Sequence, residues 1–215
     1  MWHKDRVPTV LTCNAVLFDL DGTLIDSLPA VNRAWTKFSL KHGLIPAEVL
    51  SQIHGKRSID SIRRLLPHVD AEEEDAFIRL LETTDTEGTA VLPGALQLLG
   101  KLPRHRWAVV TSGTSDVAMA RMRAAGIPEA GGYVFGNDVS SGKPAPDPFL
   151  LGATKLGFSP AECIGVEDTL AGVRSIQAAG MRAVGIGVEA ELVVRNLAEL
   201  SVSVVGSNIS ISANQ

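Results

Sequence analysis

The chain of 215 residues is long enough for one large domain or for a domain with an insertion, and its 45% apolar residues can form a sizeable core. Only 20% of the residues are charged and the formal net charge is −4, which argues against a disordered chain and against a nucleic-acid-binding protein. No apolar run approaches membrane-spanning length, so we expect no contact with a membrane.

The first predicted element is a strand at Ala15–Phe18, which is apolar on both faces and therefore buried. Asp19 follows it directly and Asp21 comes two residues later, before Gly22 and Thr23 turn the chain. Open α/β sheets bind their ligands at the carboxyl ends of strands. Two carboxylates this close repel each other, so we expect a cation between them or a proton on one of them.

Four helices are predicted next, and no strand pattern interrupts them between residues 28 and 88. Apolar residues at helical spacing mark the first helix, and Pro46 opens the second. Ser58 and Asp70 are predicted to cap the third and fourth helices. The fourth helix is expected to bury Ala76, Phe77, Leu80 and Leu81. We interpret this block as a small helical unit inserted after the first strand.

The rest of the chain alternates between helices and strands. The predicted strands cover residues 107–110, 133–135, 163–166 and 182–186, with a last strand over 202–205. Alternation of this kind implies right-handed crossovers and predicts an α/β fold with a parallel sheet in three layers.

Cys13 and Cys163 lie beside apolar residues and have no His or Cys partner at metal-ligand spacing. They indicate buried, reduced thiols in a cytoplasmic protein. Residues 1–12 lack the apolar core of a signal peptide and residues 207–215 are polar, so both ends are predicted to be flexible. A monomer is the default expectation, because no exposed apolar stripe is evident.

Three predicted strands end in polar side chains, namely Asp19 and Asp21, Thr111 and Ser112, and Glu167 and Asp168. In a parallel sheet these ends meet at one edge, and Lys143 reaches it from a loop between Gly142 and Pro144. Four carboxylates, two hydroxyls and one ammonium suit Mg²⁺, which also brings phosphate into its coordination shell. The metal would relieve the repulsion between the first two carboxylates.

The chemistry that follows is phosphoryl transfer. Asp19 is positioned to attack phosphorus and form an aspartyl-phosphate. Asp21 can protonate the leaving oxygen and then take a proton from the attacking water. Lys143 supplies positive charge to the phosphoryl oxygens and to Asp19.

The remaining polar residues of the predicted edge bind phosphate and metal. Thr111 offers a hydroxyl, and the backbone N–H groups around Ser112 and Gly113 open a helix N-terminus that suits a phosphate. Asp168 is expected to ligate the metal. Glu167 is expected to bind the metal through water or to orient a ligand.

Four stretches resemble the signature motifs of the haloacid dehalogenase superfamily of phosphatases. They are Asp-Leu-Asp-Gly-Thr-Leu-Ile-Asp-Ser at 19–27, Thr-Ser-Gly at 111–113, Lys-Pro at 143–144 and Val-Glu-Asp-Thr-Leu-Ala-Gly at 166–172. The resemblance covers residues 15 to about 205. It implies a Rossmann-like catalytic core at 13–27 and 89–206 and an inserted α-helical cap at 28–88.

Two further stretches, at 53–57 and 92–95, look like the subgroup of sugar phosphatases that act on hexitol, hexose or 2-deoxyglucose phosphates, with glycerol phosphatases as relatives. In such enzymes the cap closes over the site and contacts the leaving group, which implies that His54, Lys56 and Arg57 bind the substrate. In the family pattern Asp21 binds the metal through its backbone carbonyl. The implied function is Mg²⁺-dependent hydrolysis of a small sugar or polyol phosphate.

Two alternatives stay open at this point. A hexose phosphate mutase of the same superfamily would carry a His twelve residues after the nucleophile, where this chain has Val31. A non-catalytic sensor of phosphorylated metabolites would not need the complete set of Asp19, Asp21, Lys143 and Asp168. Asp21 also argues against a dehalogenase, which needs no leaving-group acid of this kind.

Overall fold

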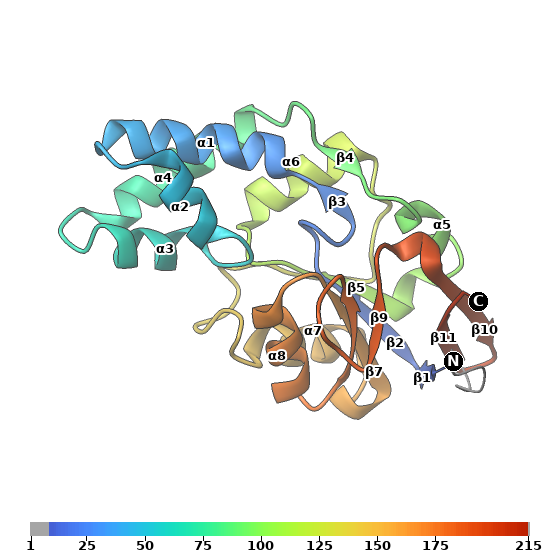
Figure 1. The fold of residues 1–215 in the computed structure, drawn as a ribbon. Helices are drawn as coiled ribbons and strands as arrows, with labels where there is room; N and C mark the ends of the chain where they lie inside the picture. The colour runs from blue at the N-terminus through green and yellow to red at the C-terminus, as the bar shows by residue number, and fades with distance from the viewer. Residues whose placement is uncertain (1–8, 215) are drawn as a thin grey trace, which may run out of the picture.

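A six-stranded, fully parallel sheet forms the centre of the protein, whose computed structural model describes residues 9–214 (Figure 1). The strand order is β6-β5-β2-β7-β8-β9, which puts the first predicted strand in the middle. The strands are β2 (Ala15–Phe18), β5 (Trp107–Val110), β6 (Gly132–Val134), β7 (Cys163–Glu167), β8 (Arg182–Ile186) and β9 (Leu192–Val194). Of these six strands, only β9 was not predicted from the sequence.

Helices cover both faces of this sheet, as the strand sequences require. Ala15 and Leu17 of β2 pack on one face with residues of α7 (Asp147–Leu156) and α8 (Leu170–Ala178). Val16 and Phe18 pack on the other face with residues of α5 (Ala95–Leu99) and α6 (Ser115–Ala125). The predicted three-layer α/β fold is therefore confirmed. Three short 3₁₀ segments at Arg104–Arg106, Pro160–Glu162 and Leu197–Glu199 complete the connections.

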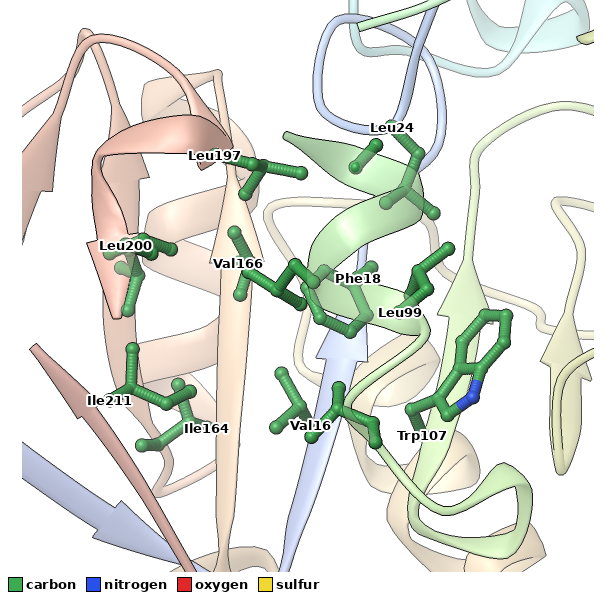
Figure 2. Packing of buried hydrophobic residues seen from close by; sticks show 14 of the residues in the cluster. Val16, Phe18, Leu24, Leu99, Trp107, Ile164, Val166, Leu197, Leu200 and Ile211 are labelled. Carbon is green, nitrogen blue, oxygen red and sulfur yellow. The ribbon is translucent and has the colours of Figure 1, made fainter. Parts of the chain in front are cut away.

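A small antiparallel sheet near both chain ends covers part of the second face. It has the order β1-β11-β10 and consists of β1 (Val10–Cys13), β11 (Asn208–Ala213) and β10 (Leu200–Val205). Ile209 and Ile211 are buried against the same core as Val16 and Val166, and Figure 2 shows Ile211 beside Ile164.

This sheet corrects the prediction that both ends are flexible. Residues 10–13 and 208–213 form strands, because Ile209 and Ile211 alternate with Ser and Asn and bury one face. The strand at 200–205 pairs with residues 208–213, outside the parallel sheet. Residues 1–8 and 215, which also belong to the predicted flexible ends, lie outside the described residues.

Four helices follow β2 between residues 28 and 84, and we call them the cap helices. They are α1 (Leu28–Lys41), α2 (Pro46–Ile53), α3 (Ser58–Leu65) and α4 (Ala71–Thr84). Two short antiparallel strands, β3 (Ile25–Asp26) and β4 (Ala90–Val91), join them to the rest of the chain. Trp35, Phe38, Ile62 and Ile78 form a core of their own between the cap helices, which lie beyond one edge of the parallel sheet (Figure 1).

Two predictions within the cap helices were wrong. Ser58 is the first residue of α3 and Arg57 occupies the N-cap position, while Asp70 caps α4 as predicted by accepting from the N–H groups of Glu72 and Glu73. Helix α4 exposes Leu80 and Ala76 and buries Ile78 with two glutamates instead. The apolar pattern pointed to the wrong face because the two glutamates, Glu74 and Glu82, are buried next to cations.

Within the described range, none of the helices combines the length and the apolar character needed to cross a bilayer.

Replacing Phe38 with Ala should lower the free energy of unfolding by about 3–5 kcal/mol, because it leaves a large hole in the cap core. Phe38 is fully buried and packs edge-on to Trp35 with ring centroids 5.3 Å apart. Leu40→Ala on the same helix is the matched control, since Leu40 is 67% exposed, and should cost less than about 0.5 kcal/mol. Urea unfolding measures both, and equal losses would contradict the packing described for α1.

Candidate active site

A cavity of about 380 Å³ lies between the carboxyl ends of the central strands and the cap helices, a size typical of small-molecule sites. The sheet edge and its loops contribute Asp19, Asp21, Thr111, Ser112, Gly113 and Asp168, and the cap side contributes His54, Lys56, Arg79 and Glu82. The polar strand ends that the sequence predicts to meet thus line one cavity, except Glu167, which is buried and absent from its lining.

Lys143 lies beneath this cavity in the loop between β6 and α7, with its side chain only 1% exposed. Its ammonium donates to Asp19 Oδ1 at 2.5 Å, to Glu167 Oε1 at 2.7 Å and to the Val110 carbonyl at 3.1 Å. Burial lowers the pKa of Lys143, but the attraction of the two carboxylates outweighs it and holds the pKa above its ordinary value. The ammonium therefore stays charged and joins the ends of three neighbouring strands.

Three carboxylates form an acidic cluster around that cation. Oxygens of Asp19, Glu167 and Asp168 all lie within 4.8 Å of one another. When all three are ionised, the one ammonium among them leaves two negative charges in excess. Burial and then the charge of Glu167 raise the pKa of Asp168 to about 7, and burial together with Glu167 and Asp168 raises that of Asp19 despite Lys143. A divalent cation would balance the excess.

The donors in this cluster fit a hard metal ion. The buried Oδ1 of Asp168 has no hydrogen-bond partner among the described residues, which leaves it available as a ligand. Glu167 instead has both oxygens occupied, because Oε1 accepts from Lys143 and Oε2 accepts from the N–H and hydroxyl of Thr169 at 2.7 and 2.8 Å. This arrangement suits Asp19 and Asp168 as direct metal ligands and Glu167 as a group that orients them.

A tight turn brings Asp168 close to the loop after β2. Gly22 has φ of +90°, and a Cβ atom there would lie 2.0 Å from Asp168 Oδ2. Only glycine combines this left-handed conformation with so close an approach. The glycine after the two aspartates is therefore a structural requirement of the carboxylate cluster.

Asp21 points away from the acidic cluster toward a different set of partners. Its Oδ1 accepts from the Ser27 hydroxyl at 2.6 Å and from Arg121 Nη1 at 2.9 Å. Its Oδ2 accepts from the Thr111 hydroxyl at 3.4 Å. The two aspartates of the first motif thus have separate surroundings, one beside an ammonium and other carboxylates, the other beside a guanidinium and hydroxyls.

The loop after β5 leads into the N-terminus of α6. The Gly113 N–H donates to the Thr111 hydroxyl at 3.0 Å, and the Ser112 hydroxyl donates to the Gly55 carbonyl in the cap at 3.1 Å. Thr111 is buried, and all three loop residues line the cavity. Backbone N–H groups at a helix start attract anions, so this loop is the part of the cavity best suited to a phosphate.

The three basic residues of the cap loop have different positions. His54 and Lys56 line the cavity, and burial lowers the pKa of His54, which favours the neutral imidazole. Arg57 is absent from the lining of this cavity. It pairs with Asp60 at 2.6 Å and donates to the Val139 carbonyl at 3.0 Å, so it attaches the cap loop to the sheet side.

Sequence reasoning missed Arg79, which lines the cavity, and two buried charged residues, Arg121 of α6 and Glu82 of α4. Arg121 and Glu82 lie 3.1 Å apart and are both buried, at 4% and 8% exposure. Each occupies the buried face of an amphipathic helix, Glu82 four residues after Ile78 and Arg121 four after Val117. A charged residue at a helix position where the pattern calls for an apolar one was the signal that could have identified both residues.

Comparison with known proteins agrees with this geometry. A family model described as haloacid dehalogenase-like hydrolase matches residues 13–180. Hexitol phosphatase A of Escherichia coli K12 is 45% identical over 206 residues, covering 90% of this chain and 95% of the relative. Glycerol-1-phosphate phosphohydrolase 2 of Saccharomyces cerevisiae is 36% identical, covering 86% and 79%. The solved structure of a β-phosphoglucomutase from Clostridium difficile matches with a TM-score of 0.74 and 26% identity, covering 88% and 93%.

Lys143→Met should lower the free energy of unfolding by about 3–5 kcal/mol, because it leaves buried carboxylates without their cation. Lys155→Met is the control, since Lys155 pairs with Asp138 at 2.9 Å but is 38% exposed. That substitution should cost less than about 1 kcal/mol. Denaturant unfolding at neutral pH distinguishes them, and a Lys143→Met protein as stable as wild type would show that the carboxylates do not need the ammonium.

Proposed function

The chain belongs to the haloacid dehalogenase-like hydrolases, and from this we propose that it is a Mg²⁺-dependent phosphatase of small sugar or sugar-alcohol phosphates. The observation that carries the proposal is the surroundings of Asp19. This carboxylate lines the cavity while one of its oxygens is held by a buried ammonium and its neighbours form an acidic cluster.

In the proposed reaction Asp19 is the nucleophile. Lys143 holds Oδ1, and no described residue donates a hydrogen bond to Oδ2, which is therefore available to attack phosphorus. The new Oδ2–P bond replaces the bond between phosphorus and the sugar oxygen and gives an aspartyl-phosphate. The loop of Thr111, Ser112 and Gly113 would bind the phosphoryl oxygens through a hydroxyl and backbone N–H groups.

Asp21 would act as the acid and then the base. It gives its proton to the sugar oxygen as that oxygen leaves phosphorus. A water molecule then attacks the aspartyl-phosphate, Asp21 takes the proton of that water, and the Asp19–phosphorus bond breaks to release phosphate. Because Asp21 lines the cavity but lies outside the acidic cluster, it is suited to exchange protons with a substrate.

Asp19 and Asp168 would hold Mg²⁺, with Glu167 orienting the site and the Asp21 backbone carbonyl as a further ligand in the family pattern. When bound, the ion neutralises charge on the phosphoryl oxygens and on the carboxylates. The charge excess of the cluster and the unpartnered Asp168 oxygen support this assignment.

The cap side supports a polar substrate with hydroxyl groups. His54, as a neutral imidazole, and Lys56 can both form hydrogen bonds to hydroxyls inside the cavity. Arg57, which the sequence predicts to bind the substrate, does not line the cavity, and its side chain is engaged by Asp60 and by a backbone carbonyl. The two curated relatives are named for a hexitol phosphatase and a glycerol phosphate phosphohydrolase, which favours a polyol phosphate.

Hydrolysis is favoured over phosphoryl transfer between positions of one sugar. The residue twelve positions after Asp19, where the mutases resembling this group carry a His, is Val31, which lines the cavity with hydrocarbon. A valine side chain can neither give nor take a proton. The position therefore offers no second acid or base for a mutase reaction.

We propose that the protein works in the cytoplasm. Cys13 and Cys163 are unpaired and buried, and burial raises the pKa of both thiols to about 12. Unpaired thiols are usual in the reducing cytoplasm. The monomeric state stays a prediction.

Asp19→Asn should reduce phosphate release from sorbitol 6-phosphate, glycerol phosphate and hexose phosphates by at least about 10⁴-fold, because an amide cannot attack phosphorus. The wild-type protein with Mg²⁺ should rank the polyol phosphates highest by kcat/KM. Asp26→Asn is a control, since Asp26 is outside the cavity lining. Turnover retained in Asp19→Asn would contradict the nucleophile, and Mg²⁺-dependent binding without any wild-type turnover would favour a sensor.

Mg²⁺ affinity should weaken about tenfold for each pH unit below about 7, because a protonated Asp168 must release its proton before it can bind metal. The pKa of about 7 for Asp168 determines where the loss begins. Calorimetric titration of Mg²⁺ between pH 8 and pH 5 measures the dependence, and EDTA should stop phosphate release until Mg²⁺ is restored. A dissociation constant that is the same at both pH values would argue against these carboxylates as ligands.

A further inference from the structure

Arg121 is a buried cation to which the proposed reaction assigns no role. Its side chain is 5% exposed and lies in the wall of the cavity. Nη1 donates to Asp21 Oδ1 at 2.9 Å, and Nη2 lies 3.1 Å from Glu82 Oε1. A guanidinium keeps its charge inside a protein, so its burial is costly unless carboxylates accompany it. Its position beside the proposed acid and base points to a part in the reaction.

The two oxygens of Asp21 have unequal surroundings. Oδ1 accepts two short hydrogen bonds, from Ser27 at 2.6 Å and from Arg121 at 2.9 Å. Oδ2 accepts only a long one among the described residues, from Thr111 at 3.4 Å. Charge-assisted bonds to a guanidinium are strong and directional. The carboxylate is therefore held by Oδ1, and Oδ2 is the oxygen left free to carry a proton into the cavity.

The second carboxylate on Arg121 comes from the cap. Glu82 belongs to α4, whereas Arg121 belongs to α6, so the guanidinium connects the cap helices to the catalytic side of the cavity. A weaker pair crosses the same helix contact, between Arg79 and Asp116 at 3.7 Å. Because Nη2 is ion-paired with Glu82, the guanidinium cannot rotate away from Asp21 without breaking that ion pair.

We infer that Arg121 is a positioning residue, which fixes the Asp21 carboxylate with Oδ2 toward the leaving oxygen, and that Glu82 holds the guanidinium in this orientation. The inference rests on the proposed phosphatase function. A misplaced acid slows the departure of a basic alkoxide, whereas a nitrophenolate leaves without a proton. The effect of replacing Arg121 on the reaction rate should therefore depend on the leaving group.

The test compares sorbitol 6-phosphate with p-nitrophenyl phosphate in single-turnover release of the alcohol or phenol. Arg121→Met should slow the first by about 10²-fold and the second by less than about threefold, the pattern expected of Asp21→Asn. Arg121→Lys should be faster than Arg121→Met, because lysine keeps the positive charge but lacks the paired N–H donors of the guanidinium. Glu82→Gln should show a smaller loss of the same kind. These substitutions should lower the rate constant for release of the alcohol and leave KM nearly unchanged.

Arg106→Met is the matched control, because Arg106 is a buried arginine, 5% exposed, that donates to the carbonyls of Asn14, Gly206 and Ser207 outside the cavity. It should destabilise the fold without changing the ratio of the two rates. Equal slowing of both substrates by Arg121→Met would reduce Arg121 to a structural residue and overturn the inference.

Crystal structures of the wild type and Arg121→Met decide the matter independently of turnover. The inference requires Asp21 in one orientation in the wild type and in altered or multiple orientations in the variant. An unchanged Asp21 would overturn it even if the enzyme is active. A wild-type protein that hydrolyses neither ester would refute the proposed function instead, while the two crystal structures would still test the positioning.

Discussion

The structure depends on one buried cation, the Lys143 ammonium, which lies between carboxylates that repel each other without it. It bonds to Asp19 after β2, to Glu167 at the end of β7 and to the carbonyl of Val110 at the end of β5. These three strands are neighbours in the sheet. One ammonium therefore joins the ends of the three central strands at the edge where a parallel sheet presents its ligands.

The cation does not balance all of the charge that it gathers. Asp168 adds a third carboxylate to the cluster, and its pKa of about 7 reflects burial beside Glu167. Without a further cation, repulsion between the carboxylates raises the free energy of the folded protein, and a bound divalent ion would lower it. The same excess negative charge that destabilises the fold locally would thus favour the binding of a divalent cation, a compromise usual at functional sites.

Most of the sheet and the acidic part of the site could be predicted from sequence, for a physical reason. Buried parallel strands are continuous apolar runs, so their ends are visible, and polar residues placed there converge in any parallel sheet. The antiparallel strand at 208–213 escaped prediction because its two buried isoleucines stand among serines and asparagine. The face of α4 was misjudged because pairing with cations allowed glutamates to be buried. The basic loop at 53–57 singles out Arg57 in the sequence. Only the contacts of its side chain show that it attaches the cap loop to the sheet side and does not line the cavity.

The cap and the sheet edge divide the requirements of phosphate transfer between them. The groups that form and break bonds with phosphorus must be held rigidly, and they are supplied by strand ends. The groups that meet the rest of a substrate come from helices and loops, where sequence can vary without disturbing the sheet. Arg121 bridges the two parts, since it contacts Asp21 on one side and Glu82 on the other. Because charges form this bridge, the alignment of Asp21, the proposed acid, is coupled to the presence of the cap, and loss of the contact with the cap would leave that carboxylate less firmly oriented.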